Sequence, residues 1–283
     1  MKPCIVATRR SPLALAQSRL VVAQFQRTLG LECELLEVMT TGDRKTQWDL
    51  QEKGGKGLFT GELEQHLRQR SADIAVHSTK DLPGDLPGDL AIAGYLPRGD
   101  ARDVLVTRTG IITPKTVATS SPRRRLQLMR MLPAATFTVI RGNVDTRLRK
   151  IAEGAAEATV LAAAGLARLG IATWPGLDFH WLDPKKMVPA VGQGAIAVQS
   201  RARDTGNYAA ALDSVTARHV NLERALQAAL GSGCNTAFGA YAGDGTLYFF
   251  HEQTGAHQLP LSPDDLNAPV ATAQRVLQAL GLG

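Results

Sequence analysis

The chain contains 283 residues, of which 44% are hydrophobic, 20% are charged and 5% are aromatic. This ordinary globular composition excludes a disordered or collagen-like chain, and the length suggests two or three domains. Lysine and arginine number 32 against 26 aspartates and glutamates, a net charge of +6 that suits either a nucleic acid or a small polyanionic ligand.

Charge placement and apolar patterning narrow the class of protein. No apolar run is long enough to span a bilayer, and the first residues enter a strand-like segment without signal-peptide anatomy. The three cysteines are far apart and show no metal-ligand spacing. The arginines gather at loop-to-helix junctions, which favours an anion pocket over a nucleic-acid surface. We therefore expect a cytoplasmic protein with no metal site and no membrane or nucleic-acid partner.

Strand and helix patterns alternate along the first part of the chain. Strands are predicted at residues 4–8, 32–40, 74–76 and 90–96, and helices at 12–29 and 60–69. A turn is expected at 41–44. The polar, glycine-rich residues 44–57 predict a mobile loop, in which Lys53 and Lys56 either close over an anionic ligand or stay solvated. From the residues alone, the solvated loop is the simpler interpretation.

A similar alternation follows the Pro97–Asp100 boundary. Strands are predicted at residues 104–107, 116–119, 136–140 and 158–162, and helices at 122–132, 144–152 and 163–169. The strand at 196–199 is expected to return to the first lobe, because the second lobe is already complete. A small α+β region follows, with a helix at 219–230, a hairpin at 238–250 and a helix at 270–280.

A short sequence pattern occurs twice, once in each half of the chain. Residues 7–13 and 118–123 both leave a strand through Ala-Thr and start a helix with Ser-Pro. Serine as N-cap and proline at the first helical position are strong start signals. This repeated pattern predicts two similar α/β lobes, each directing a helix N-terminus toward a shared cleft.

The strand at 74–76 ends in a hydroxyl, an ammonium and a carboxylate, from Ser78, Lys80 and Asp81. In open α/β sheets, ligands bind beyond the carboxyl ends of strands. Lys80 and Asp81 therefore form either part of a ligand site or a solvated charge pair. For His77, a satisfied structural role is the preferred interpretation.

Three loop-to-helix junctions are suited to anions. Ser120, Ser121, Arg123 and Arg124 surround a helix N-terminus, where free N–H groups and the dipole favour negative charge. Arginines beside a helix start also occur in the stretch from Arg141 to Arg147. In the first lobe, the same arrangement occurs at Arg9 with Ser11. Solvated arginines are the alternative, and for Arg141 and Arg147 both interpretations stay open.

Cys234 lies in a Gly-Ser-Gly-Cys loop after a helix, where its sulfur could be approached. A thiolate is a good nucleophile for an electrophilic carbon. No nearby base can be recognised, so the residues alone favour a small buried hydrophobe.

The motifs together resemble the porphobilinogen deaminase family. The resemblance covers nearly the whole chain, and its motifs occur in order at residues 7–15, 54–59, 73–83, 119–124, 141–148, 190–195 and 233–234. It implies an α/β fold of two type II periplasmic-binding-protein-like lobes with mixed sheets, plus a small C-terminal α+β domain. The implied boundaries are 1–97 with 194–205 for the first lobe, 98–193 for the second and 208–283 for the third domain.

The resemblance also implies an activity and a set of site residues. Four porphobilinogen molecules are joined head to tail with loss of ammonia on a dipyrromethane cofactor, which a thioether attaches to Cys234, and hydroxymethylbilane is released. Asp81 matches the catalytic aspartate, which interacts with pyrrole N–H groups and a cationic intermediate. The positions that match residues handling substrate carboxylates are Arg9, Ser11, Gln17, Arg141 and Arg147. The positions that match residues holding the cofactor are Asp43, Lys56, Ser78, Lys80, Thr119, Ser120, Ser121, Arg123 and Arg124.

The chain departs from the family pattern in a few places. Glu52 stands where a lysine is common, with Lys53 beside it, and Gly61 replaces another lysine. Pro122 stands where an aliphatic residue is usual, and Ala237 where a proline is frequent. The alternative hypothesis is a non-catalytic anion-binding module on a two-lobed fold, which needs neither Asp81 nor a modified cysteine. The resemblance further implies a monomer.

Overall fold

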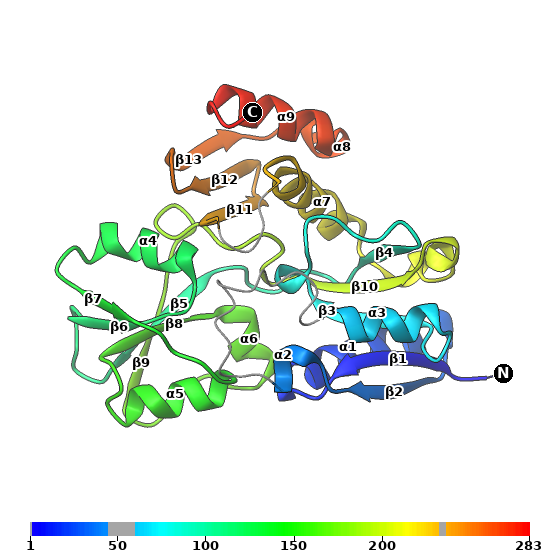
Figure 1. Cartoon of the computed structure of the whole chain (residues 1–283), viewed down its shortest axis with the longest axis horizontal. Coiled ribbons are helices and arrows are strands. Elements are labelled where there is room, and N and C mark those ends of the chain that lie inside the picture. Colours follow the sequence, from blue (N-terminus) through cyan, green and yellow to red (C-terminus); the bar gives the residue numbers. More distant parts are fainter. Residues whose placement is uncertain (1, 45–59, 232–235) are drawn as a thin grey trace. The chain divides into compact units, whose positions relative to one another are not determined.

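A computed structural model describes residues 2–44, 60–231 and 236–283 (Figure 1). These residues form two compact units. The first comprises Met1–Gly99, Ala195–Cys234 and Asp264–Gly283, and the second comprises Asp100–Gly194 and Asn235–Pro263. The division into three domains at the boundaries given above stays a prediction.

The first unit contains a five-stranded mixed sheet with the order β2-β1-β3-β10-β4. Its strands are β1 (Cys4–Arg9), β2 (Cys33–Val38), β3 (Ile74–Ser78), β4 (Leu90–Tyr95) and β10 (Ile196–Arg201). The strands β1, β2 and β3 are parallel, and β10 runs antiparallel between β3 and β4. The predicted return of the strand at 196–199 to the first lobe is confirmed.

Helices α1 (Pro12–Leu29) and α3 (Gly61–Arg68) cover opposite faces of this sheet. Because side chains alternate along a strand, Val6 packs with Phe25 of α1, whereas Ala7 packs with Leu63 of α3. The predicted N-cap of α1 is present, since the Ser11 hydroxyl accepts a hydrogen bond from the Ala14 amide. Residues 41–44, predicted as a turn, form one helical turn, α2 (Thr41–Arg44).

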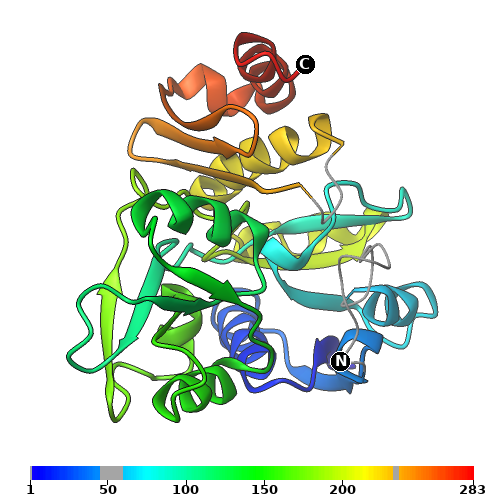
Figure 2. The ribbon, with the colours of Figure 1, turned by 60° about the vertical axis from the view of Figure 1, so that its left-hand side comes forward.

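The second unit repeats the same topology with the order β7-β6-β8-β5-β9. Its strands are β5 (Asp103–Arg108), β6 (Thr116–Ala118), β7 (Thr136–Thr138), β8 (Ala158–Ala162) and β9 (Leu177–Trp181). Here β5 is the inserted antiparallel strand. Figures 1 and 2 show helices α4 (Pro122–Met131) and α5 (Val144–Ala152) on opposite sides of this sheet, and α6 (Ala163–Arg168) follows β8.

The two sheets confirm the predicted fold class of two type II periplasmic-binding-protein-like lobes. In both, one strand is inserted antiparallel between the third and the fourth of the other strands, β10 in the first unit and β5 in the second. The connection from β1 to α1 corresponds to that from β6 to α4, so Ser11 and Ser121 occupy equivalent N-cap positions. The sequence pattern that occurs in both halves therefore corresponds to a structural repeat.

The C-terminal part supplies helices to one unit and a sheet to the other. Helix α7 (Ser214–Ala229) packs with α9 (Pro269–Ala279) in the first unit, and α8 (Pro263–Asn267) precedes α9. Strands β11 (Phe238–Gly243), β12 (Thr246–His251) and β13 (Gly255–Pro260) form an antiparallel sheet in the second unit. The predicted hairpin is thus part of a three-stranded sheet. Helix α7 begins earlier than predicted because Asp213 caps it.

Short 3₁₀ helices complete the first unit. They are η1 (Thr79–Asp81), η2 (Ala202–Asn207) and η3 (Ala209–Ala211). Among the described residues, no helix is both long and apolar enough to cross a membrane.

Candidate active site

The carboxyl edge of the first sheet gathers several of the predicted site residues. Arg9 ends β1, Asp43 follows β2, and Ser78, Lys80 and Asp81 lie at the end of β3. These three strands are parallel, so their carboxyl ends share one edge of the sheet. This edge is where ligands bind in open α/β sheets.

Arg9 and Asp43 form a two-pronged ion pair at this edge. The Arg9 Nη2 and Nε atoms lie 2.5 Å and 3.3 Å from the two carboxylate oxygens of Asp43. The Thr40 hydroxyl also donates to Asp43, over 2.7 Å. Burial alone would raise the pKa of Asp43, but the hydrogen bonds from Arg9 and Thr40 and the Arg9 charge outweigh it, so this pKa lies below its ordinary value. Asp43 therefore stays ionised and holds Arg9 at the edge.

Gln17 contacts Ser78 directly. Its amide nitrogen and oxygen lie 2.8 Å and 3.0 Å from the Ser78 hydroxyl, and the Gln17 side chain is buried. Gln17 was predicted to handle substrate carboxylates and Ser78 to hold the cofactor. The structure joins the two residues, with Gln17 orienting the hydroxyl at the last residue of β3.

The Asp81 carboxylate is exposed on a firmly held backbone. The Thr79 amide and hydroxyl both donate to the Ala195 carbonyl, at 3.2 Å and 3.0 Å. Leu82, which follows Asp81, is 2% exposed and packs with Tyr95 and Val220. Within the described part of the chain, no hydrogen bond or ion pair engages the Asp81 carboxylate. Asp81 thus presents a carboxylate acceptor from a fixed backbone position.

The corresponding edge of the second sheet carries the predicted hydroxyl groups. The Thr119 amide donates to Thr138, which ends β7, and the Ser120 hydroxyl donates to the Ile140 carbonyl over 2.6 Å. The Ser121 hydroxyl accepts a hydrogen bond from the Arg124 amide and caps α4. These contacts place the N-terminus of α4 at the carboxyl edge of the sheet, a position that favours anions.

Arg123 and Arg124 are buried and share one carboxylate, that of Asp103. Arg123 Nη1 lies 2.8 Å from one Asp103 oxygen, and Arg124 Nη2 lies 2.7 Å from the other. The Gln193 amide donates to Asp103 as well, over 3.0 Å. Burial alone would raise the pKa of Asp103, but the two arginine charges hold it well below its ordinary value. Direct contact of either arginine with a cofactor stays a prediction.

The third predicted anion junction is formed by Arg141 and Arg147. The Arg147 Nε atom donates to the Gly142 carbonyl over 2.7 Å. Gly142 has a φ of +120°, and a Cβ there would lie 2.7 Å from a Thr146 methyl group, so only glycine fits. This tight turn places Arg141 and Arg147 beside the start of α5.

The remaining predicted residues have simpler outcomes. Lys56 and Cys234 lie outside the described residues. Burial lowers the pKa of His77 to about 4, so its ring is neutral at neutral pH, and its Nε2 lies 2.9 Å from Gln199 Oε1. The structural role predicted for His77 is confirmed by this buried hydrogen bond. Among the described residues, no group of three or more histidine, cysteine, aspartate or glutamate side chains could hold a metal ion.

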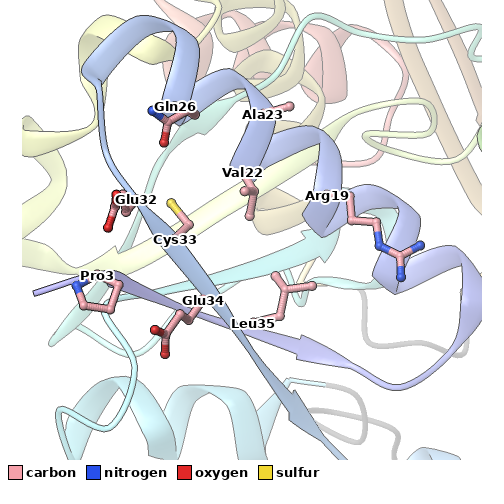
Figure 3. Close-up of a pocket in the computed structure, with 9 residues that line it drawn as sticks. All are labelled: Pro3, Arg19, Val22, Ala23, Gln26, Glu32, Cys33, Glu34 and Leu35. Carbon is pink, nitrogen blue, oxygen red and sulfur yellow. The ribbon is translucent and has the colours of Figure 1, made fainter.

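A surface hollow of about 570 Å³ lies between α1 and β2, away from these residues (Figure 3). Val22, Cys33 and Leu35 line it together with Arg19 and other polar side chains. No predicted site residue lines this hollow.

Comparison with known proteins decides the family. Residues 4–208 match the family model described as porphobilinogen deaminase, dipyromethane cofactor binding domain. The chain belongs to the porphobilinogen deaminase family. It is 43% identical over 249 residues to a porphobilinogen deaminase of Sorangium cellulosum, covering 84% of this chain and 81% of that protein. It is also 43% identical over 254 residues to that of Syntrophobacter fumaroxidans, covering 86% and 81%.

The porphobilinogen deaminase resemblance stated from the sequence is thus confirmed, as is the dipyrromethane class of cofactor. Among solved structures, the periplasmic VFT2 domain of Bordetella pertussis BvgS shares 19% identity with a TM-score of 0.45, covering 78% of this chain and 92% of that domain. The roles of individual residues stay predictions.

Sequence reasoning missed three charged residues that the structure buries fully or in part. Asp103 starts β5, where a single acid before an apolar strand gave no signal of its two arginine partners. Arg168, in α6, donates to the Gly194 carbonyl, and burial lowers its pKa to about 10. Arg224 lies on α7 and contacts the segment after Asp81. The amphipathic pattern of α7 could not separate it from solvated arginines.

Proposed function

We propose that this chain catalyses the stepwise deamination and head-to-tail condensation of four porphobilinogen molecules, followed by hydrolytic release of hydroxymethylbilane. The observation that carries the proposal is the exposed Asp81 carboxylate at a sheet edge that also presents Arg9 and Lys80, in a chain of the porphobilinogen deaminase family. Each porphobilinogen carries an acetate and a propionate, which explains the surplus of cations.

The donor set fits a dipyrromethane cofactor. Such a group brings carboxylates, which need cations and N–H donors, and pyrrole N–H groups, which need an acceptor. In the first unit, the ammonium of Lys80 is a cation for a carboxylate and Asp81 is an acceptor for pyrrole N–H groups. In the second unit, the N-terminus of α4 with Ser121 offers N–H donors for a carboxylate. Cys234 is the residue proposed to form the thioether. When bound, the cofactor supplies the pyrrole carbon to which the first substrate is joined.

The side chains of this protein bind substrate carboxylates, orient neighbouring groups and stabilise the charge that develops during the reaction. Arg9, held by Asp43, binds a substrate carboxylate, and Arg141 and Arg147 do the same beside α5. Gln17 keeps the Ser78 hydroxyl in one orientation. Asp81 accepts hydrogen bonds from pyrrole N–H groups and stabilises the positive charge that develops when ammonia leaves. Arg123 and Arg124 fix the start of α4 through Asp103.

Turnover tests this proposal. Purified protein incubated with porphobilinogen should release ammonia and form a linear tetrapyrrole that cyclises and oxidises to a porphyrin, which absorbance and mass spectrometry detect. Binding of porphobilinogen without release of ammonia would instead support a non-catalytic module. We also propose a monomer, as the family resemblance implies, in a reducing cytoplasm, as the widely spaced cysteines favour. Light scattering of the purified protein tests the monomer.

A further inference from the structure

Helix α7 is connected to the backbone that directly follows Asp81. The Nη2 atom of Arg224 donates to the carbonyl oxygens of Pro83 and Gly84, at 3.1 Å and 3.2 Å. These carbonyls belong to the second and third residues after Asp81. One guanidinium group therefore holds two successive peptide units of this segment.

The Arg224 side chain occupies a costly position. Its Nη1 atom is buried and has no hydrogen-bond partner in the structure, and no salt bridge engages it among the described residues. Burial lowers the pKa of Arg224, while Tyr95 and Asp85 act in the opposite direction. A largely buried cation without a paired carboxylate costs stability. Its two bonds to the backbone are thus the specific interactions that account for its placement.

Close packing reinforces these hydrogen bonds. A Cβ at Gly84 would lie 3.4 Å from Gln227 Cγ and 3.5 Å from Ala228 Cα, so the segment runs against the last turns of α7. Leu82 packs with Val220 on the same helix. The backbone from Leu82 to Gly84 is therefore fixed on α7 by apolar contact and by Arg224.

We propose that Arg224 is a positioning residue for Asp81: by holding the Pro83 and Gly84 carbonyls, it fixes the direction in which the Asp81 carboxylate points. The inference rests on the proposed function of Asp81. Helix α7 ends five residues before Cys234 in the sequence. The same helix thus anchors the segment that carries the carboxylate and leads to the proposed cofactor cysteine.

Substitution of Arg224 tests the proposal through kcat per cofactor-loaded enzyme. For Arg224→Met we expect kcat to fall about tenfold or more while KM stays within about twofold, because a misplacement of the order of 1 Å costs up to about 100-fold. Arg224→Lys, which keeps a donor, should restore part of kcat. Arg218→Met removes an exposed arginine from the same helix and should leave kcat unchanged. Intact mass gives the loaded fraction of each variant.

Hydrogen exchange of the peptide spanning residues 79–90 provides a second readout. We expect faster exchange there in Arg224→Lys, and faster still in Arg224→Met, with little change in β1 and β2. If Arg224→Met does not fold, Arg224→Lys decides by the same two measurements. Unchanged kcat and exchange, or a change in KM alone, would refute the positioning role. Near-normal turnover of Asp81→Asn would instead refute the proposed role of Asp81, and the absence of ammonia release by the unsubstituted protein would refute the proposed function, so these failures are distinguishable from a failure of the Arg224 proposal.

Discussion

Replacement of Asp81 by asparagine should lower turnover of porphobilinogen by about 100- to 10,000-fold, the range typical of a lost proton-transfer or charge-stabilising group. The substitution keeps size and shape but removes the negative charge. The backbone contacts of Thr79 and the burial of Leu82 do not involve the carboxylate, so the fold should survive. The measurement is the rate of ammonia release per cofactor-loaded enzyme.

The matched control for this prediction is Asp89→Asn. Asp89 is an exposed carboxylate further along the same segment and pairs with Arg68 at the surface. Its loss should leave turnover near that of the wild type, because surface ion pairs contribute little. Near-normal turnover of a fully loaded Asp81→Asn protein would remove Asp81 from the mechanism.

Asp103→Asn should destabilise the protein by about 3–5 kcal/mol, the cost typical of removing one partner of a buried ion pair. Asp103 is fully buried and accepts hydrogen bonds from Arg123, Arg124 and Gln193. Without its charge, two buried guanidinium groups face each other uncompensated. Denaturant titration measures this loss of stability. Hydrogen exchange in the second unit then shows whether the loss is located there.

The pH dependence of the Asp103 effect has a definite sign. The pKa of Asp103 is depressed in the folded state, so its contribution is present above the unfolded pKa, near 3.8, and is lost as the pH falls below that value. The wild type should therefore exceed Asp103→Asn in stability at neutral pH by more than at strongly acid pH.

The control for the Asp103 substitution is Asp100→Asn, which breaks a partly exposed pair with Arg102 and should cost less than about 1 kcal/mol. Equal effects of the two substitutions would contradict the role given to Asp103.

Local signals account for the parts of the fold that the sequence predicted well. Ser11-Pro12 and Ser121-Pro122 start helices because a hydroxyl cap and a fixed φ act within one turn. The limits of α5 and β8 also agree with the prediction. The strands β9 and β13 were missed. Each is an edge strand with exposed positions, so its hydrophobic pattern is weak.

Long-range partners explain what the sequence could not predict at the site. Gln17 and Ser78 lie 61 positions apart, and Arg123 is 20 positions from Asp103. Whether an arginine is solvated, binds a ligand or is buried on a carboxylate depends on such partners and not on its neighbours in sequence. For Cys234 the local composition favoured a buried thiol, and only the family resemblance assigned it the cofactor.

The intact mass of the purified protein tests the central claim most directly. The protein should be heavier than its sequence by two condensed porphobilinogen units, and peptide mapping should place the addition on Cys234. Cys234→Ser should have the mass of the bare chain and no turnover, while Cys33→Ser should keep the added mass. An unmodified wild-type protein that nevertheless turns over porphobilinogen, or an addition on another residue, would contradict the account.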